Sequence, residues 1–115
     1  MSKLPYIHKM KMTRDTTEEF SFYVSGVVDE VTGAYFTVKK SINQADPTFQ
    51  KTLSNGISVE DDRYTVTISP SDTVNLDPGQ YVYDVKIIYG SNKKQLMTGV
   101  FELDRGVTER ETSNA

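Results

Sequence analysis

Apolar and polar side chains alternate with a period of two along most of this chain, and helical periodicity is hard to find. Between residues 80 and 89, one face carries an unbroken apolar set: Tyr81, Tyr83, Val85, Ile87 and Tyr89. The same alternation recurs in residues 20–24, 34–38 and 64–68. Because successive side chains of a strand point to opposite faces of its sheet, this pattern predicts half-buried β-strands.

Eight such segments are expected to be strands: residues 6–12, 19–24, 34–39, 49–53, 57–59, 64–68, 80–89 and 95–104. Short strands separated by turn residues are typical of an antiparallel β-sandwich, here of about seven to eight strands. A length of 115 residues suits one domain, which we expect over residues 1–104, followed by a polar, mobile tail over 105–115. The predicted core consists of Phe20, Phe22, Phe36, Val66, Ile68, Leu76, Tyr81, Tyr83, Val85 and Phe101.

Glycine and proline mark the expected connections. Asn55-Gly56 is the dipeptide that favours a type I′ hairpin turn. Residues 90–92 divide the two longest predicted strands, which should therefore form a second hairpin. Residues 69–73 combine a proline with small polar side chains and predict a single capped turn of helix.

Residues 72–83 contain the most specific local pattern. Pro78-Gly79 favours a tight turn, and Leu76 before it is expected to enter the core. Tyr81, near the start of the next strand, can then donate a hydrogen bond back to the turn backbone. This is the tyrosine corner of immunoglobulin-like sandwiches, so we predict an all-β, immunoglobulin-like fold. Tyr83 stands where antibody domains have a cysteine.

The residue types that carry most enzyme chemistry are scarce. The chain has no cysteine, and His8 is its only histidine, which rules out disulfides, thiolate metal sites and a catalytic triad formed by this chain alone. A net charge of −3 disfavours nucleic acid and anionic membranes as partners. We expect a soluble protein, made in the cytoplasm, with no enzymatic activity and no cofactor; a small-molecule ligand is not expected.

One run of three acids and one single aspartate are candidate sites. Glu60, Asp61 and Asp62 could bind calcium on a sandwich loop, but the spaced ligands and the glycine of a calcium loop are missing, which favours a solvated turn. Asp84 could serve as a glycosidase acid, yet no second carboxylate can be named for it. An outward residue of the polar face, beside Lys86, is the simpler interpretation of Asp84.

The two ends of the chain differ in charge. Residues 1–14 contain Lys3, Lys9, Lys11 and Arg14 and no acid, whereas residues 102–115 contain four acids and two arginines. These four basic residues are candidates for contact with an acidic protein surface, such as the tail of an identical neighbour in a ring. The alternative is a set of solvated charges on an edge strand, where charge blocks aggregation.

Several stretches occur in the same order in small immunoglobulin-like domains of tailed bacteriophages. They are residues 14–16, 34–40, 56–57, 67–73, 76–85, 98–102 and 107–108. Over nearly its whole length, the chain resembles the N-terminal domain of phage baseplate upper proteins. The resemblance implies a structural or adaptor protein located in the virion, in the baseplate, tail, neck or head, whose partners are other virion proteins and copies of itself. Baseplate upper proteins continue well past this domain, so we expect either a free-standing accessory protein or an excised domain.

Two other functions remain open at this stage. Outward-facing Tyr23 and Tyr35 could form the platform of a carbohydrate-binding module. A bacterial adhesion domain is a third possibility, which the N-terminal sequence disfavours because it contains no secretory signal.

Overall fold

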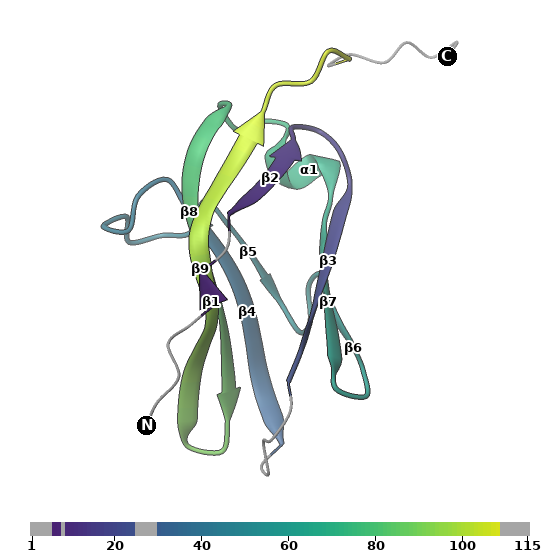
Figure 1. Ribbon diagram of the computed structural model, residues 1–115, viewed down its shortest axis with the longest axis vertical. Helices are drawn as coiled ribbons and strands as arrows, with labels where there is room; N and C mark the ends of the chain where they lie inside the picture. Colours follow the sequence, from purple (N-terminus) through teal and green to yellow (C-terminus); the bar gives the residue numbers. More distant parts are fainter. Residues whose placement is uncertain (1–5, 8, 25–29, 109–115) are drawn as a thin grey trace.

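The computed structural model describes residues 6–7, 9–24 and 30–108, which form nine strands and one short helix (Figure 1). The elements are β1 (Tyr6–Ile7), β2 (Met10–Thr13), β3 (Glu18–Tyr23), β4 (Val31–Lys39), β5 (Phe49–Thr52), β6 (Ile57–Glu60), β7 (Arg63–Ile68), α1 (Pro70–Thr73), β8 (Gly79–Tyr89) and β9 (Asn92–Asp104). The predicted first strand is divided into β1 and β2, and β4 and β9 begin earlier than predicted, at Val31 and Asn92. Among the described helices, none is long and apolar enough to cross a membrane.

The strands form two sheets that face each other. In the large sheet, β1 and β2 both pair with β9, and the order continues β9–β8–β4–β5; the small sheet has the order β3–β7–β6. The neighbours pair antiparallel, except that β1 and β2 run parallel to β9. This strand order is that of immunoglobulin-like domains. The predicted all-β, immunoglobulin-like sandwich is therefore confirmed.

Aromatic rings fill the space between the sheets. Phe36 is fully buried at the centre of this cluster, and its ring lies near those of Phe20, Phe49, Tyr83 and Phe101. Eight of the ten residues predicted for the core are buried. The other two, Phe20 and Leu76, are partly buried and pack against it. The sequence alternation thus identified the inward faces correctly.

Two hairpins have two-residue turns. Gly90-Ser91 joins β8 to β9, as predicted, and Gly90 has a φ of 56°. Asp61-Asp62 joins β6 to β7, with a φ of 57° at Asp61, so the acidic run forms a turn between strands. Aspartate is one of the few residues with a side chain that tolerate this left-handed conformation.

The prediction of an Asn55-Gly56 hairpin is wrong. The strands on either side, β5 and β6, belong to different sheets, so this segment crosses from one sheet to the other. Thr52 and Asn55 exchange two backbone hydrogen bonds of 2.9 Å around Leu53-Ser54, and only Gly56 has a positive φ, of 98°. A Cβ on Gly56 would lie 2.5 Å from Cδ of Lys51. Glycine is therefore needed at this position for close packing against Lys51.

Candidate functional site

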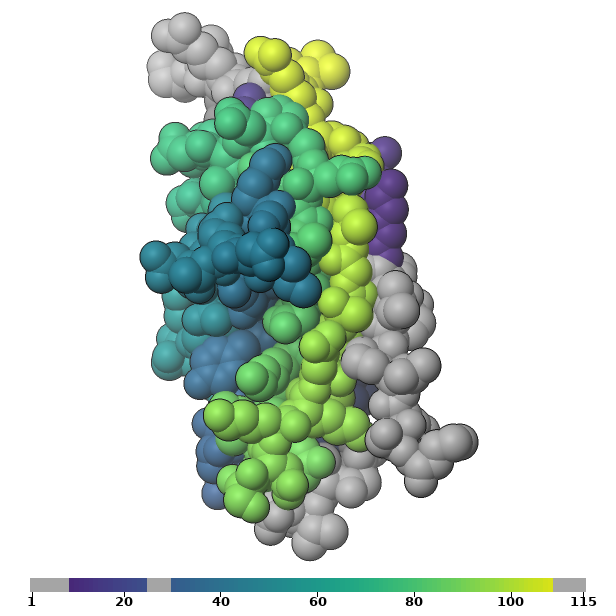
Figure 2. Space-filling model, turned by 90° about the vertical axis from the view of Figure 1, so that its left-hand side faces the viewer, coloured from purple at the N-terminus to yellow at the C-terminus, as the bar shows by residue number. Residues whose placement is uncertain are grey.

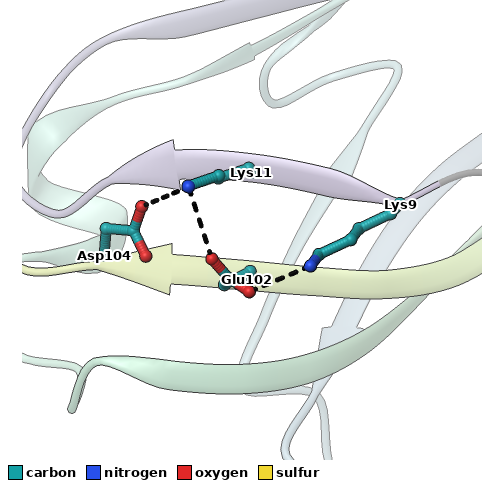
Figure 3. Close-up of polar contacts among 4 residues, drawn as sticks. All are labelled: Lys9, Lys11, Glu102 and Asp104. Carbon is teal, nitrogen blue, oxygen red and sulfur yellow. Dashed lines mark ion pairs between the residues drawn. The ribbon is translucent and has the colours of Figure 1, made fainter.

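The basic residues of the N-terminal segment meet acids of β9 in the same chain (Figure 3). Because β2 runs parallel to β9 with Lys11 opposite Glu102, side chains of opposite charge lie along one edge of the large sheet. Lys9 Nζ is 3.1 Å from Glu102 Oε1, and Lys11 Nζ is 3.7 Å from Glu102 Oε2 and 3.3 Å from Asp104 Oδ2. We call these four residues the charged edge.

Arg14 has a structural role. Its Nη1 donates a hydrogen bond of 2.9 Å to the carbonyl of Leu76, and its backbone N–H donates one of 2.8 Å to the carbonyl of Asp104. Arg14 therefore ties the start of the β2–β3 connection to the segment before β8. Lys3 lies outside the described residues. A contact of these basic residues with another protein stays a prediction.

The charged edge should make folding stability depend on pH. Hydrogen bonding and attraction to Lys9 lower the pKa of Glu102. The ionised Glu102 therefore stabilises the fold above its unfolded pKa, and this stabilisation is lost as the pH falls through the folded pKa. Hydrogen bonding to Asp104 raises the pKa of Lys11. The charged Lys11 therefore stabilises the fold fully below its unfolded pKa, and this stabilisation is lost as the pH rises through the folded pKa. We expect Glu102→Gln to be less stable than wild type at neutral pH, but not at strongly acidic pH.

Thermal unfolding across the pH range, at low and high salt, measures this difference. Because the lysines are exposed, salt should reduce it. Glu60→Gln, in the exposed β6–β7 hairpin, is the matched control. If Glu102→Gln is less stable than wild type by the same amount at acidic and neutral pH, the expected titration of Glu102 is contradicted.

The tyrosine corner has the geometry expected from the sequence. The Tyr81 hydroxyl donates a 2.6 Å hydrogen bond to the carbonyl of Asp77, and burial raises the pKa of Tyr81. Lys40 Nζ lies 4.4 Å from the ring centroid of Tyr81, which places a cation over the ring. Gly79 has a φ of 143°, which a residue with a side chain rarely adopts, after Pro78 of the turn. The corner residues thus support the fold.

Removing the corner hydrogen bond should have a moderate effect. Tyr81→Phe keeps the buried ring but leaves the Asp77 carbonyl without this donor, so we expect the free energy of unfolding to fall by about 1 kcal/mol. Urea unfolding measures the change. Tyr23→Phe is the control, since Tyr23 is 66% exposed. Equal stability of Tyr81→Phe and wild type would show that the corner bond contributes nothing.

A groove of about 540 Å³ lies on the outer face of the large sheet. Its floor is formed by outward side chains of β4, β5, β8 and β9, and one wall by Ile42, Ala45 and Pro47 of the 40–48 loop. Figure 2 looks onto this face: the loop, in blue, rises beside the green and yellow-green strands β8 and β9. The groove is larger than a second hollow of about 350 Å³, which is lined by residues of β2, β3 and β9.

Asp84 lies on the floor of this groove, half-buried. It pairs in register with Thr37 of β4 and Thr98 of β9. The Thr98 hydroxyl donates instead to the Tyr83 carbonyl, and within the described residues no hydrogen bond or ion pair reaches the Asp84 carboxylate. Burial raises the pKa of Asp84, an effect that the charges of Lys86 and Lys39 oppose. Asp84 is thus a partly desolvated carboxylate that makes no hydrogen bond or ion pair in the part of the chain that the structure describes.

The candidate residues for glycosidase, sugar-binding and metal sites are not brought together in the described part of the chain. Asp84 is the only carboxylate among the described residues that line the groove, so the second acid of a glycosidase is not supplied here. Tyr23 lies on the outer face of the small sheet and Tyr35 on that of the large sheet, so they cannot share one sugar platform. No group of three His, Cys, Asp or Glu in the described ranges could hold a metal ion, and His8 lies outside them.

Lys51 and Asp72 form an ion pair that the sequence prediction missed. Lys51 of β5 points between the sheets and is 6% exposed, and its Nζ lies 2.6 Å from Asp72 Oδ2 of α1. The same Oδ2 accepts the backbone N–H of Ser69 at 2.7 Å, which caps the helix. The sequence does indicate that Lys51 points inward, because strand side chains alternate and Lys51, two residues after Phe49, lies on the same inward face, whereas Gln50 is exposed. The pair joins an edge of the large sheet to α1.

No protein-family model matches the sequence, and no curated protein is significantly similar to it. Among solved structures, the chain is similar to the extracellular domain of the voltage-gated sodium channel β4 subunit, with a TM-score of 0.48, 10% identity, and coverage of 93% of this chain and 98% of that one. It is similar to novel immune-type receptor 11 of Ictalurus punctatus, with a TM-score of 0.46, 16% identity, and coverage of 99% and 94%.

A proposed glycoside hydrolase from Bacteroides vulgatus is also similar, with a TM-score of 0.49 and 17% identity over 86% of this chain. The chain spans 17% of the length of that protein. The immunoglobulin-like assignment therefore stands on the strand order and the corner hydrogen bond described above.

Proposed function

We propose that this chain is a non-enzymatic structural or adaptor protein that binds another protein through the groove on the outer face of the large sheet. The observation that carries the proposal is the groove itself, with an apolar wall, a mixed polar and apolar floor, and one partly desolvated carboxylate that makes no hydrogen bond or ion pair with the described residues. Concave surfaces that combine apolar contact area with a few placed polar groups are typical of binding sites.

The wall of the groove supports a protein partner. Ile42 on the 40–48 loop is 81% exposed, and Tyr35 and Ile88 are partly exposed on the floor. A partner that covers these side chains would remove apolar surface from water, and this burial is the main favourable term in most protein associations. The exposed isoleucine beside the groove is therefore a candidate anchor.

The setting that we propose is a tailed-phage particle, with other virion proteins and copies of this chain as partners. This part of the proposal rests on the sequence resemblance to phage baseplate domains. Mass spectrometry of purified virions tests it directly, because the chain must be present in the particles. Its absence from them would overturn the virion location.

Site-specific crosslinking tests the binding face. A photoreactive benzoylphenylalanine in place of Gln95, which lines the groove, should crosslink to another protein in purified particles. The same group at exposed Ser58 on the small sheet is the matched control. Crosslinks from position 95 and not from 58 would support the groove as the interface. Crosslinks from position 58 alone would overturn it.

A further inference from the structure

The groove follows β8 for a length that suits an extended peptide. The outward residues of β8 that line it are Val82, Asp84, Lys86 and Ile88. Each two-residue step along a strand covers about 6.6 Å, so the four side chains span about 20 Å. That distance corresponds to about six residues of extended chain lying along the sheet face.

Charge along the groove has a definite order. Lys39 of β4 pairs in register with Val82, so its cationic side chain stands at one end of the row, with Asp84 next and Lys86 beyond it. The floor therefore presents positive, negative and positive charge in succession. Neither lysine makes an ion pair with Asp84, whose carboxylate keeps its capacity to accept hydrogen bonds.

We infer that the groove selects an extended partner segment that places an Arg or Lys side chain on Asp84 and acidic side chains near Lys39 and Lys86. This inference rests on the proposed function of the groove. Side chains two residues apart share a face of an extended segment, so the matching pattern is acid, any residue, Arg or Lys, any residue, acid. A cation there would give the carboxylate charge-assisted hydrogen bonds and offset its desolvation.

Two short peptides provide the test. The matched probe is acetyl-Gly-Glu-Thr-Arg-Thr-Glu-Gly-amide, and the charge-swapped probe is acetyl-Gly-Arg-Thr-Glu-Thr-Arg-Gly-amide. Amide chemical-shift titrations of the whole chain should show the matched peptide binding at least about tenfold more tightly, with shifts at groove residues. Asp84→Asn, which is nearly isosteric, should reduce the preference, because only Lys39 and Lys86 then distinguish the two peptides, and Asp84→Lys should reduce it further. Glu60→Gln, in the β6–β7 hairpin, should leave it unchanged.

Several results would overturn the inference. Equal affinity for the two peptides, or an unchanged preference in Asp84→Asn, would remove Asp84 as the selecting residue. Groove shifts that depend on protein concentration without peptide would identify a second copy as the occupant instead. These results overturn the inference alone, and the proposed function still holds if position 95 crosslinks in particles. Absence of a crosslink from position 95 would overturn the proposed function itself.

Discussion

Phe36→Ala is expected to lower the free energy of unfolding by about 3–5 kcal/mol. Phe36 is fully buried, and its ring centroid lies 5.1 Å from that of Phe20, 6.0 Å from Phe49, 5.8 Å from Tyr83 and 6.3 Å from Phe101. Because these rings come from both sheets, the cavity left by alanine would lie where the two sheets pack together. Small domains are stable by only about 5–15 kcal/mol, so the loss is a large share of the total.

Urea unfolding followed by circular dichroism measures this effect. Val59→Ala is the matched control, since Val59 is 47% exposed on β6, and we expect it to change stability by less than about 0.5 kcal/mol. If Phe36→Ala does not fold, Phe36→Leu provides the measurement, because it removes less volume. Its loss of stability should be larger than that of Val59→Ala and smaller than the loss expected for Phe36→Ala. Similar losses for Phe36→Ala and Val59→Ala would show that the aromatic cluster does not hold the sheets together.

Breaking the Lys51–Asp72 pair is expected to cost about 3 kcal/mol for either single change, Lys51→Met or Asp72→Asn. Lys51 and Asp72 side chains are 7% and 18% exposed, so each single variant leaves one charge in a poorly hydrated place. The asparagine keeps an oxygen that can accept the Ser69 N–H, which separates loss of charge from loss of the helix cap. Most of the cost is therefore assigned to the uncompensated charge.

A double-mutant cycle identifies the coupling. Because the double variant leaves neither charge in place, it should be more stable than the sum of the two single effects predicts, by about 1 kcal/mol or more. Lys93→Met, which removes an exposed lysine of β9, controls for the loss of a positive charge in general. Strictly additive single effects would mean that the ion pair contributes nothing specific to the fold.

Alternation along the sequence predicted most strands and their inward faces, because burial on one side of a sheet imposes a period of two. It placed the start of β9 too late, since Asn92, Lys93 and Lys94 are polar and become a strand only through pairing with β8. The hairpin predicted from the Asn55-Gly56 dipeptide was wrong for a different reason. The dipeptide signals a local turn, but which sheet the next strand joins depends on tertiary packing.

The candidate sites were harder to predict because they, too, depend on tertiary packing. The opposite charges of the two chain ends were evident, but strand partners decide whether they meet within one chain, and β2 lies beside β9. Asp84 was correctly placed on an outward face. The groove around it is lined in part by the 40–48 loop, whose conformation has no periodic signal in the sequence.

The parallel ladder between β2 and β9 has a mechanical consequence. A force that pulls the start of β2 and the end of β9 apart acts along both strands in opposite directions, because the two strands run the same way. The hydrogen bonds between them are then loaded together in shear, whereas bonds of a hairpin pulled at its open end break one after another. The β2–β9 pair should therefore resist a pull between the start of β2 and the end of β9 best when the force lies along the strand axis.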